Sequence, residues 1–193
     1  MKRNFCKPLV VMTPKSLLRL PACVSPIDEF VSGRFRDVLD DAAADAGRVR
    51  RVLLCSGKVF YELAEARKQD NLSDLAIVRV EQFYPLHEEL LKQVLARFGR
   101  AKQLVWVQEE SQNMGGWSFM EPRLRALGYA CDYVGRDASA SPATGSLQVH
   151  RREQKELVEA AIAGTIPHLV RAASARRPVA PVTDGRVAAP AGK

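Results

Sequence analysis

Short apolar runs alternate with amphipathic segments along most of the chain. The runs are rich in Val, Ile and Leu and cover residues 9–12, 49–55, 75–80 and 103–107, with a weaker run at 130–134. Uninterrupted apolar runs of this length are typical of strands that are buried on both faces. We therefore expect a buried strand in each run, and the first strand ends at Thr13 and Pro14 in a basic, polar loop.

The segments between these runs carry apolar residues at helical spacing. They cover residues 58–69, 87–98, 117–127 and 147–163. Helical spacing places the apolar side chains on one face, which then packs against the sheet. Gly128 and Gly164 directly follow two of these segments, at the position where a helix C-cap residue is expected. This alternation predicts an α/β layer fold with a mainly parallel sheet.

Two stretches do not follow the alternation. Residues 13–48 form a long connection that holds a helical patch at 26–31 and an apolar piece at 35–39, and the acidic, Ala-rich residues 40–47 predict a solvated loop. After residue 164 the chain is rich in Ala, Pro and Arg without periodicity. We therefore expect one domain at residues 1–164 and a disordered, basic, Pro- and Ala-rich tail at residues 165–193.

Composition and charge narrow the classes of partner. The 193 residues allow one domain with a sizeable core, and no apolar run is long enough to cross a membrane. The first apolar run is also too short for a signal peptide, so we expect a cytoplasmic protein without a membrane partner. The net charge of +7 comes from the two ends, because residues 8–164 are neutral overall. The sequence therefore does not predict nucleic acid binding.

The four cysteines and three histidines predict no metal or catalytic site. The cysteines are widely spaced, with no Cys-x-x-Cys pair and no histidine at ligand spacing. In a reducing cytoplasm they are not expected to form disulfides. No histidine has a serine or cysteine at a spacing that implies a catalytic triad, so no catalytic residue is assigned.

Two groups of residues are candidates for binding an anion. Ser56, Gly57 and Lys58 follow a predicted strand, where backbone N–H groups and a lysine can hold an anion. The favoured alternative is a tight turn in which Gly57 relieves backbone strain and Ser56 caps the helix. Arginines in predicted loops are suited to phosphate groups, although they could instead bridge domains or face water; they include Arg19, Arg34, Arg36 and Arg136.

Five sequence blocks, in order, resemble one known domain. They are Lys7-Pro-Leu-Val-Val-Met-Thr-Pro-Lys-Ser-Leu-Leu-Arg19, Cys55-Ser-Gly-Lys58, Ile77-Val-Arg-Val-Glu-Gln82, Trp106-Val-Gln-Glu-Glu110 and Arg136-Asp-Ala-Ser-Ala-Ser-Pro142. The match covers roughly residues 3–163. It resembles the C-terminal domain of the thiamine-diphosphate-dependent decarboxylating component of 2-oxoglutarate dehydrogenase.

The resemblance implies a fold and a supporting role. Such domains are three-layer α/β/α units with a five-stranded, mostly parallel sheet, like the C-terminal domain of transketolases. The resemblance places the catalytic apparatus, with thiamine diphosphate and magnesium, in other domains. This chain has no Gly-Asp-Gly followed by the Asn of the diphosphate signature, so we expect it to bind no cofactor and to be inactive alone.

Partners and site residues also follow from the resemblance. The implied partners are the remaining domains of the component, a second copy in a homodimer, and the lipoyl succinyltransferase of the tricarboxylic acid cycle complex. The strand ends should face those domains, which gives interface roles to Glu81, Gln82, Glu109, Glu110 and Trp117. The resemblance also allows an allosteric site for AMP or acetyl-CoA, for which the candidates are Arg19, Arg34, Ser56, Lys58 and Arg136.

Two other functions remain open on the sequence. One is a stand-alone regulatory module that binds a nucleotide in the crevice of Ser56, Gly57 and Lys58. The other is a hydrolase that uses Ser56 or Cys55, but no general base accompanies either residue.

Overall fold

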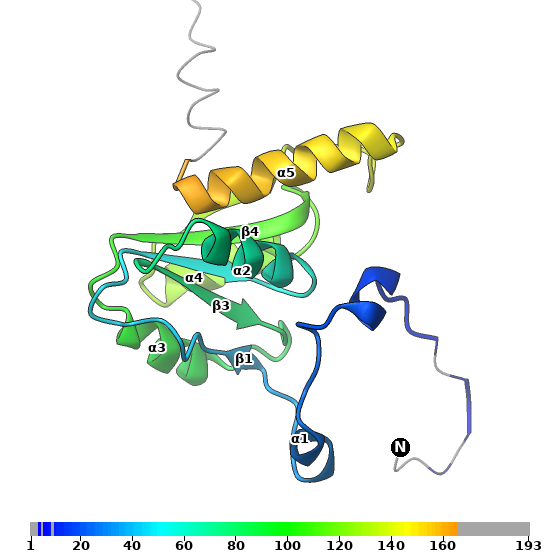
Figure 1. Cartoon of the computed structure of the whole chain (residues 1–193), viewed down its shortest axis with the longest axis horizontal. Coiled ribbons are helices and arrows are strands. Elements are labelled where there is room, and N and C mark those ends of the chain that lie inside the picture. Colours follow the sequence, from blue (N-terminus) through cyan, green and yellow to red (C-terminus); the bar gives the residue numbers. More distant parts are fainter. Residues whose placement is uncertain (1–3, 5, 9, 166–193) are drawn as a thin grey trace, which may run out of the picture.

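A five-stranded sheet with the strand order β1-β3-β2-β4-β5 organises the computed structural model, which describes residues 4, 6–8 and 10–165 (Figure 1). The strands are β1 (Val38–Leu39), β2 (Arg51–Cys55), β3 (Leu75–Val80), β4 (Gln103–Ser111) and β5 (Asp132–Arg136). Strands β2 to β5 run parallel, and β1 pairs antiparallel with β3. The carboxyl ends of four strands therefore meet at one edge of the sheet, which we call the carboxyl edge.

Helices cover both faces of the sheet. Leu63 of α2 (Val59–Gln69) and Leu157 of α5 (Leu147–Ala163) pack against one face. Leu91 of α3 (Glu88–Arg97) and Leu124 of α4 (Trp117–Ala126) pack against the other face. The prediction of a three-layer α/β/α fold with a mostly parallel sheet is confirmed.

Alternating residues of each strand supply the two apolar cores. In β2, Leu53 faces α2 and α5, and Leu54 faces α3 and α4. In β4, Val105 likewise faces α2 and α5, and Trp106 faces α3 and α4. Each fully buried aliphatic side chain contributes about 1.5–3 kcal/mol, so burial in these two cores is a large favourable term in folding.

Both ends of α5 are capped, and the cap at Gly164 agrees with the sequence prediction. The Ser146 side chain accepts a hydrogen bond from the N–H of Val149, which caps the first turn. Gly164 ends the helix at φ 74°, in the left-handed region that favours glycine. The Arg51 guanidinium donates to the carbonyls of Ala161 and Ile162, whose places in the last turn leave them without helical partners.

The prediction of a first strand at residues 9–12 is wrong for the part that the structure describes. Val10, Val11 and Met12 are exposed and belong to no strand. The fifth strand is β1, which lies in the apolar piece at 35–39. There the carbonyl of Asp37 accepts hydrogen bonds from the N–H groups of residues 81 and 82, so the piece continues the ladder of β3.

The prediction of a solvated loop at residues 40–47 is also wrong in part. Asp41 is buried and forms an ion pair with Arg67 of α2. Its carboxylate also accepts a hydrogen bond of 2.9 Å from the N–H of Ile77 in β3. Ala44 and Ala46 pack against the core. The loop therefore closes one edge of the core, because a buried carboxylate is tolerated where a cation and an N–H group satisfy it.

We call residues 10–36 the N-terminal arm and residues 37–165 the body. The two parts differ in how far their side chains are buried. The arm contains the short helices η1 (Lys15–Arg19) and α1 (Ile27–Val31), neither of which has a buried residue. Figure 1 shows the arm standing off the body at the edge toward which β3 points. At Cys23 the arm comes close to the body, and the influence of this thiol on the Tyr61 hydroxyl of α2 raises the pKa of Tyr61.

Two further expectations concern the C-terminal tail and membrane-spanning segments. The tail expected at residues 165–193 lies outside the described residues except for Thr165. Within residues 10–165, no helix has both the length and the apolar character needed to cross a bilayer.

Candidate interdomain interface

The carboxyl edge is the place where an open α/β sheet brings polar loops together. After β2 the chain continues to β3 on one side, whereas β4 lies on the other side of β2. In open α/β sheets, ligands commonly bind at such a point, where the loops leave in opposite directions. Here the turn at residues 56–58 and the end of β4 lie at this point.

Ion pairs of Lys58 join the elements at this point. The Nζ atom of Lys58 lies 2.6 Å from Oε1 of Glu109 in β4 and 2.6 Å from Oε1 of Glu62 in α2. Burial opposes the charge of Lys58, but the hydrogen bonds to the two carboxylates outweigh it and raise the pKa of the ammonium group. An incoming anion would have to displace these carboxylates.

The turn before α2 is a tight strand-to-helix connection. Gly57 has φ 69°, which confirms that glycine relieves backbone strain there. No side chain caps α2, so the expected Ser56 cap is wrong. The N–H of Gly57 lies 3.3 Å from Oε1 of Glu81 at the end of β3. A carboxylate of the same chain thus already occupies one backbone donor that an anion would need.

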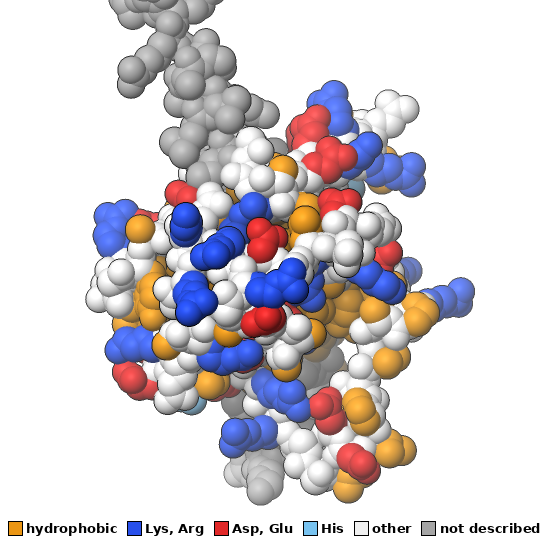
Figure 2. Space-filling model, turned by 60° about the vertical axis from the view of Figure 1, so that its left-hand side comes forward, with side chains coloured by type: hydrophobic (Ala, Val, Ile, Leu, Met, Phe, Trp, Pro, Cys, Tyr) orange, Lys and Arg blue, Asp and Glu red, His pale blue; other side chains and the backbone are white. Residues whose placement is uncertain are grey.

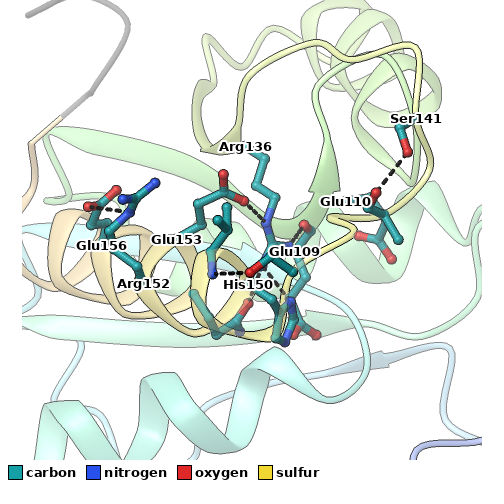
Figure 3. A network of polar contacts seen from close by, with 12 residues as sticks. Glu109, Glu110, Arg136, Ser141, His150, Arg152, Glu153 and Glu156 are labelled. Carbon is teal, nitrogen blue, oxygen red and sulfur yellow. Dashed lines mark hydrogen bonds and ion pairs between the residues drawn. The ribbon is translucent and has the colours of Figure 1, made fainter.

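Arg136, at the end of β5, is the centre of a second polar network (Figure 3). Its Nε donates to Glu153 of α5 at 2.9 Å, and its Nη2 donates to Gln154 at 3.1 Å. Nη2 also contacts Nδ1 of His150 at 3.2 Å, and Nη1 donates to the carbonyl of Glu109. The guanidinium therefore joins β4, β5 and α5.

The two networks are continuous. Gln154 donates from Nε2 to Oε2 of Glu62, the carboxylate that also pairs with Lys58. Lys58 and Arg136, both proposed from the sequence for an anionic effector, are thus brought into one network whose positive charges already have partners within the chain.

A groove of about 760 Å³ lies beside Arg136, between the end of β4, the loop at 137–146 and the first half of α5. The charged residues that line the groove are mainly acidic. The acidic ones are Glu109, Glu110, Asp137, Glu153 and Glu156, and the basic ones are Arg136 and Arg152, with His150 beside them. Figure 3 shows the acidic side chains of α5 beside Arg136 and Arg152. The acidic lining does not favour an anionic ligand.

The remaining effector candidates lie elsewhere. Arg19 is exposed on η1, and Arg34 is exposed in the loop after α1. Arg34 borders a separate small hollow with Glu29 and Arg36, which form an ion pair of 2.7 Å. No hydrogen bond or ion pair within residues 10–165 joins Arg19 or Arg34 to Arg136.

The residues proposed for interdomain contacts are grouped at the carboxyl edge. Gln82 donates to the carbonyl of Pro85 at 2.9 Å, and this bond shapes the loop that exposes Tyr84. Glu110 is exposed, whereas Glu109 points to Lys58, as expected for adjacent residues of one strand. Trp117 is half-buried, with its ring 5.2 Å from that of Tyr133.

Gln108 is an organising residue that the sequence analysis did not single out. Its buried side-chain oxygen accepts from Nε1 of Trp106 and from the N–H of Trp117, both at 2.9 Å. Its Nε2 donates to the carbonyls of Ser111 and Met114. The side chain therefore shapes the loop that leads into α4. A polar residue directly after a buried apolar run was the available signal.

The described residues offer no metal or nucleophile site of the usual kind. No group of three or more His, Cys, Asp or Glu side chains within residues 10–165 could hold a metal ion. Burial raises the pKa of the Cys55 thiol to about 12, so it is not an activated nucleophile.

The fold is that of a three-layer α/β/α domain, with basic side chains at the carboxyl edge that are paired with carboxylates and with an N-terminal arm that exposes apolar side chains. Comparison with known proteins identifies the family. The model of the 2-oxoglutarate dehydrogenase C-terminal family matches residues 24–162. The chain belongs to this family.

Curated relatives agree and also show the chain's share of the larger protein. The 2-oxoglutarate dehydrogenase E1 component of Geobacillus kaustophilus is 48% identical over 166 residues, which cover 83% of this chain and 18% of the relative. The E1 components of Cupriavidus necator and Rickettsia conorii are 43% and 44% identical, over 84% and 81% of this chain and 18% of each relative. The chain thus spans less than a fifth of these relatives.

Proposed function

We propose that this chain serves as the C-terminal supporting domain of a 2-oxoglutarate dehydrogenase E1 component, and that it docks on the remaining part of that component. The observation that carries the proposal is the distribution of exposed apolar residues. Among the described residues, nine of the eleven exposed large apolar side chains lie in the N-terminal arm. They are Val10, Val11, Met12, Leu18, Val24, Ile27, Phe30, Val31 and Phe35.

Such an exposed set is typical of a surface that is covered in an assembly. The other two exposed apolar residues, Tyr84 and Leu147, lie at the carboxyl edge and at the start of α5. Figure 2 shows charged side chains over most of the visible face, with hydrophobic side chains among them, including several on the lower projection. The arm and the carboxyl edge together would form the docking surface.

The finer parts of the proposal come from the family. In the intact component, the other domains would bind thiamine diphosphate and magnesium and decarboxylate 2-oxoglutarate, as a homodimer that passes the succinyl group to a lipoyl succinyltransferase. The cytoplasm would be its location. Effector binding at Lys58 or Arg136 remains a prediction, and a stand-alone nucleotide-binding module is less well supported because both residues are ion-paired within the chain.

A chimeric enzyme tests this function. In the chimera, this chain replaces the aligned segment of the Geobacillus kaustophilus E1 component, and a second version of that relative lacks the segment. With thiamine diphosphate and magnesium, we expect the chimera to decarboxylate 2-oxoglutarate, and we expect neither the shortened relative nor this chain alone to do so. Turnover by the chain alone, or a folded chimera no more active than the shortened relative, would contradict the proposal.

A further inference from the structure

Residues 10–12 have the composition of a strand, but the structure gives them no strand to pair with. Val10 and Val11 are β-branched, which favours extended backbone. The three side chains are 68% to 91% exposed. Pro14 then ends the segment in an extended conformation, with φ −66° and ψ 123°. A segment of this kind in water leaves both its apolar side chains and its backbone hydrogen-bonding groups without protein partners.

Residues 10–12 pair with neither edge of the sheet in the body. The edge strands are β1, which has only two residues and pairs with β3, and β5, which pairs with β4. The family model begins at residue 24, next to Cys23, where the arm comes close to α2. Residues 10–12 therefore lie outside the domain that the family model delimits, and on the far side of that point.

We infer that residues 10–12 add as a strand to a sheet in the remaining part of the E1 component. This inference rests on the proposed function and names the contact through which docking occurs. Backbone hydrogen bonds would supply the affinity, and pockets for alternate side chains would supply the specificity.

The side-chain pattern also describes the receiving sheet. In a strand, Val10 and Met12 point to one face and Val11 points to the other. Because all three are apolar, both faces of the added strand require covering. The acceptor is therefore a sheet with helices or other layers on both faces, as in a parallel α/β domain, and not a sheet with one face in water.

Hydrogen exchange in the chimeric enzyme tests the inference. We expect those amides of residues 10–12 that point to the acceptor strand to exchange at least roughly a hundredfold more slowly in the chimera than in the isolated chain, because ladder hydrogen bonds block exchange. Protection of the loops at residues 81–85 and 111–116 is measured in the same experiment and reports docking of the carboxyl edge.

Proline variants show whether backbone pairing is responsible. In the chimera, Val10→Pro and Val11→Pro each remove one N–H group, whereas the control Val11→Ile keeps the N–H group and the β-branched shape. An edge strand pairs through alternate residues, so one proline should abolish the protection and the other should weaken it less. If the strand lies between two others, both prolines should abolish the protection. Val11→Ile should leave it unchanged.

Each other outcome decides a different point. If the carboxyl-edge loops become protected but residues 10–12 do not, the strand inference is wrong and the proposed function stands. If no part of the chain gains protection, docking itself is absent and both proposals fail. If residues 10–12 are already protected in the isolated chain, they pair with the body or with a second copy, and the strand inference is contradicted.

Discussion

In the body, Val52 and Leu54 of β2 are buried between the sheet and its helices, whereas in the N-terminal arm Val31 and Phe30 of α1 are about four-fifths exposed. Both segments have regular structure and carry large apolar side chains. The difference is that β2 has β3 and β4 beside it and helices on both faces, while α1 has only five residues and no buried side chain. An apolar segment is thus buried by its own chain only where neighbouring elements of that chain can cover it.

The polar contacts of the body and of the arm differ in a similar way. In the body, Arg136 and Lys58 have carboxylate partners from other elements. In the arm, Arg36 pairs with Glu29 only seven residues away, and both side chains are well exposed. Long-range polar contacts hold the body together, whereas the arm makes mainly local ones. We therefore expect the body to determine the stability of the isolated chain and the arm to determine its association.

The largest difference should come from shortening one apolar side chain in each region. Leu54→Ala leaves a cavity in a fully buried site and should lower the free energy of unfolding by about 2–5 kcal/mol. The control Val31→Ala removes an exposed side chain and should change it by less than about 0.5 kcal/mol. Urea unfolding of the isolated variants measures both values. Equal losses would show that the arm packs on the body.

An intermediate difference should separate two arginines. Arg136→Ala leaves Glu153 and Gln154 without their guanidinium partner in a partly buried network, so we expect a loss of about 1–3 kcal/mol in unfolding free energy. Arg34→Ala removes an exposed side chain and should have almost no effect. Thermal and urea unfolding provide the measurement. A silent Arg136→Ala variant would mean that the network contributes no stability.

At neutral pH the cysteine thiols should affect stability least among these groups. Their reactivities, however, should differ strongly from one cysteine to another. Burial raises the pKa of both Cys55 and Cys131 to about 12, whereas Cys6 is exposed. A disulfide reagent at pH 8 should therefore label Cys6 first in the folded chain, reach the half-buried Cys131 more slowly, and reach the buried Cys55 only after unfolding. Labelling of all four thiols at similar rates in the folded chain would contradict the burial.

The same two thiols give a pH dependence with a definite sign. Their pKa is higher in the folded chain than the ordinary value of 9.0, so the unfolded chain loses these protons first. Their contribution to stability is complete below pH 9 and is lost as the pH rises from 9 toward 12. Urea midpoints across this range measure the loss.

The sequence predicted those parts of the fold whose apolar residues are covered by the chain itself. The segments at 75–80 and 147–163 became β3 and α5 because each finds its partners within the body. The segment at 9–12 has the same apolar character, but a pattern shows only that a segment needs covering and not which part of the protein covers it. The strand prediction failed there for that reason.

The site was harder to predict than the fold because its contacts join distant positions. Asp41 finds Arg67 and the N–H of Ile77, 26 and 36 residues away, and no local pattern at residues 40–47 indicates either contact. The pairing of Lys58 with Glu109 likewise requires the strand order β2-β4. Interface roles for Glu81, Gln82, Glu109, Glu110 and Trp117 remain predictions.

Hydrogen exchange of the isolated chain tests the division between body and arm most directly. The account predicts strong protection at Leu53 and Val78 in the central strands, and exchange at the rate of an unfolded peptide at Val11 and Phe30. Protection of the arm comparable to that of the strands would contradict the account, because it would show that the arm already has its partner within the chain.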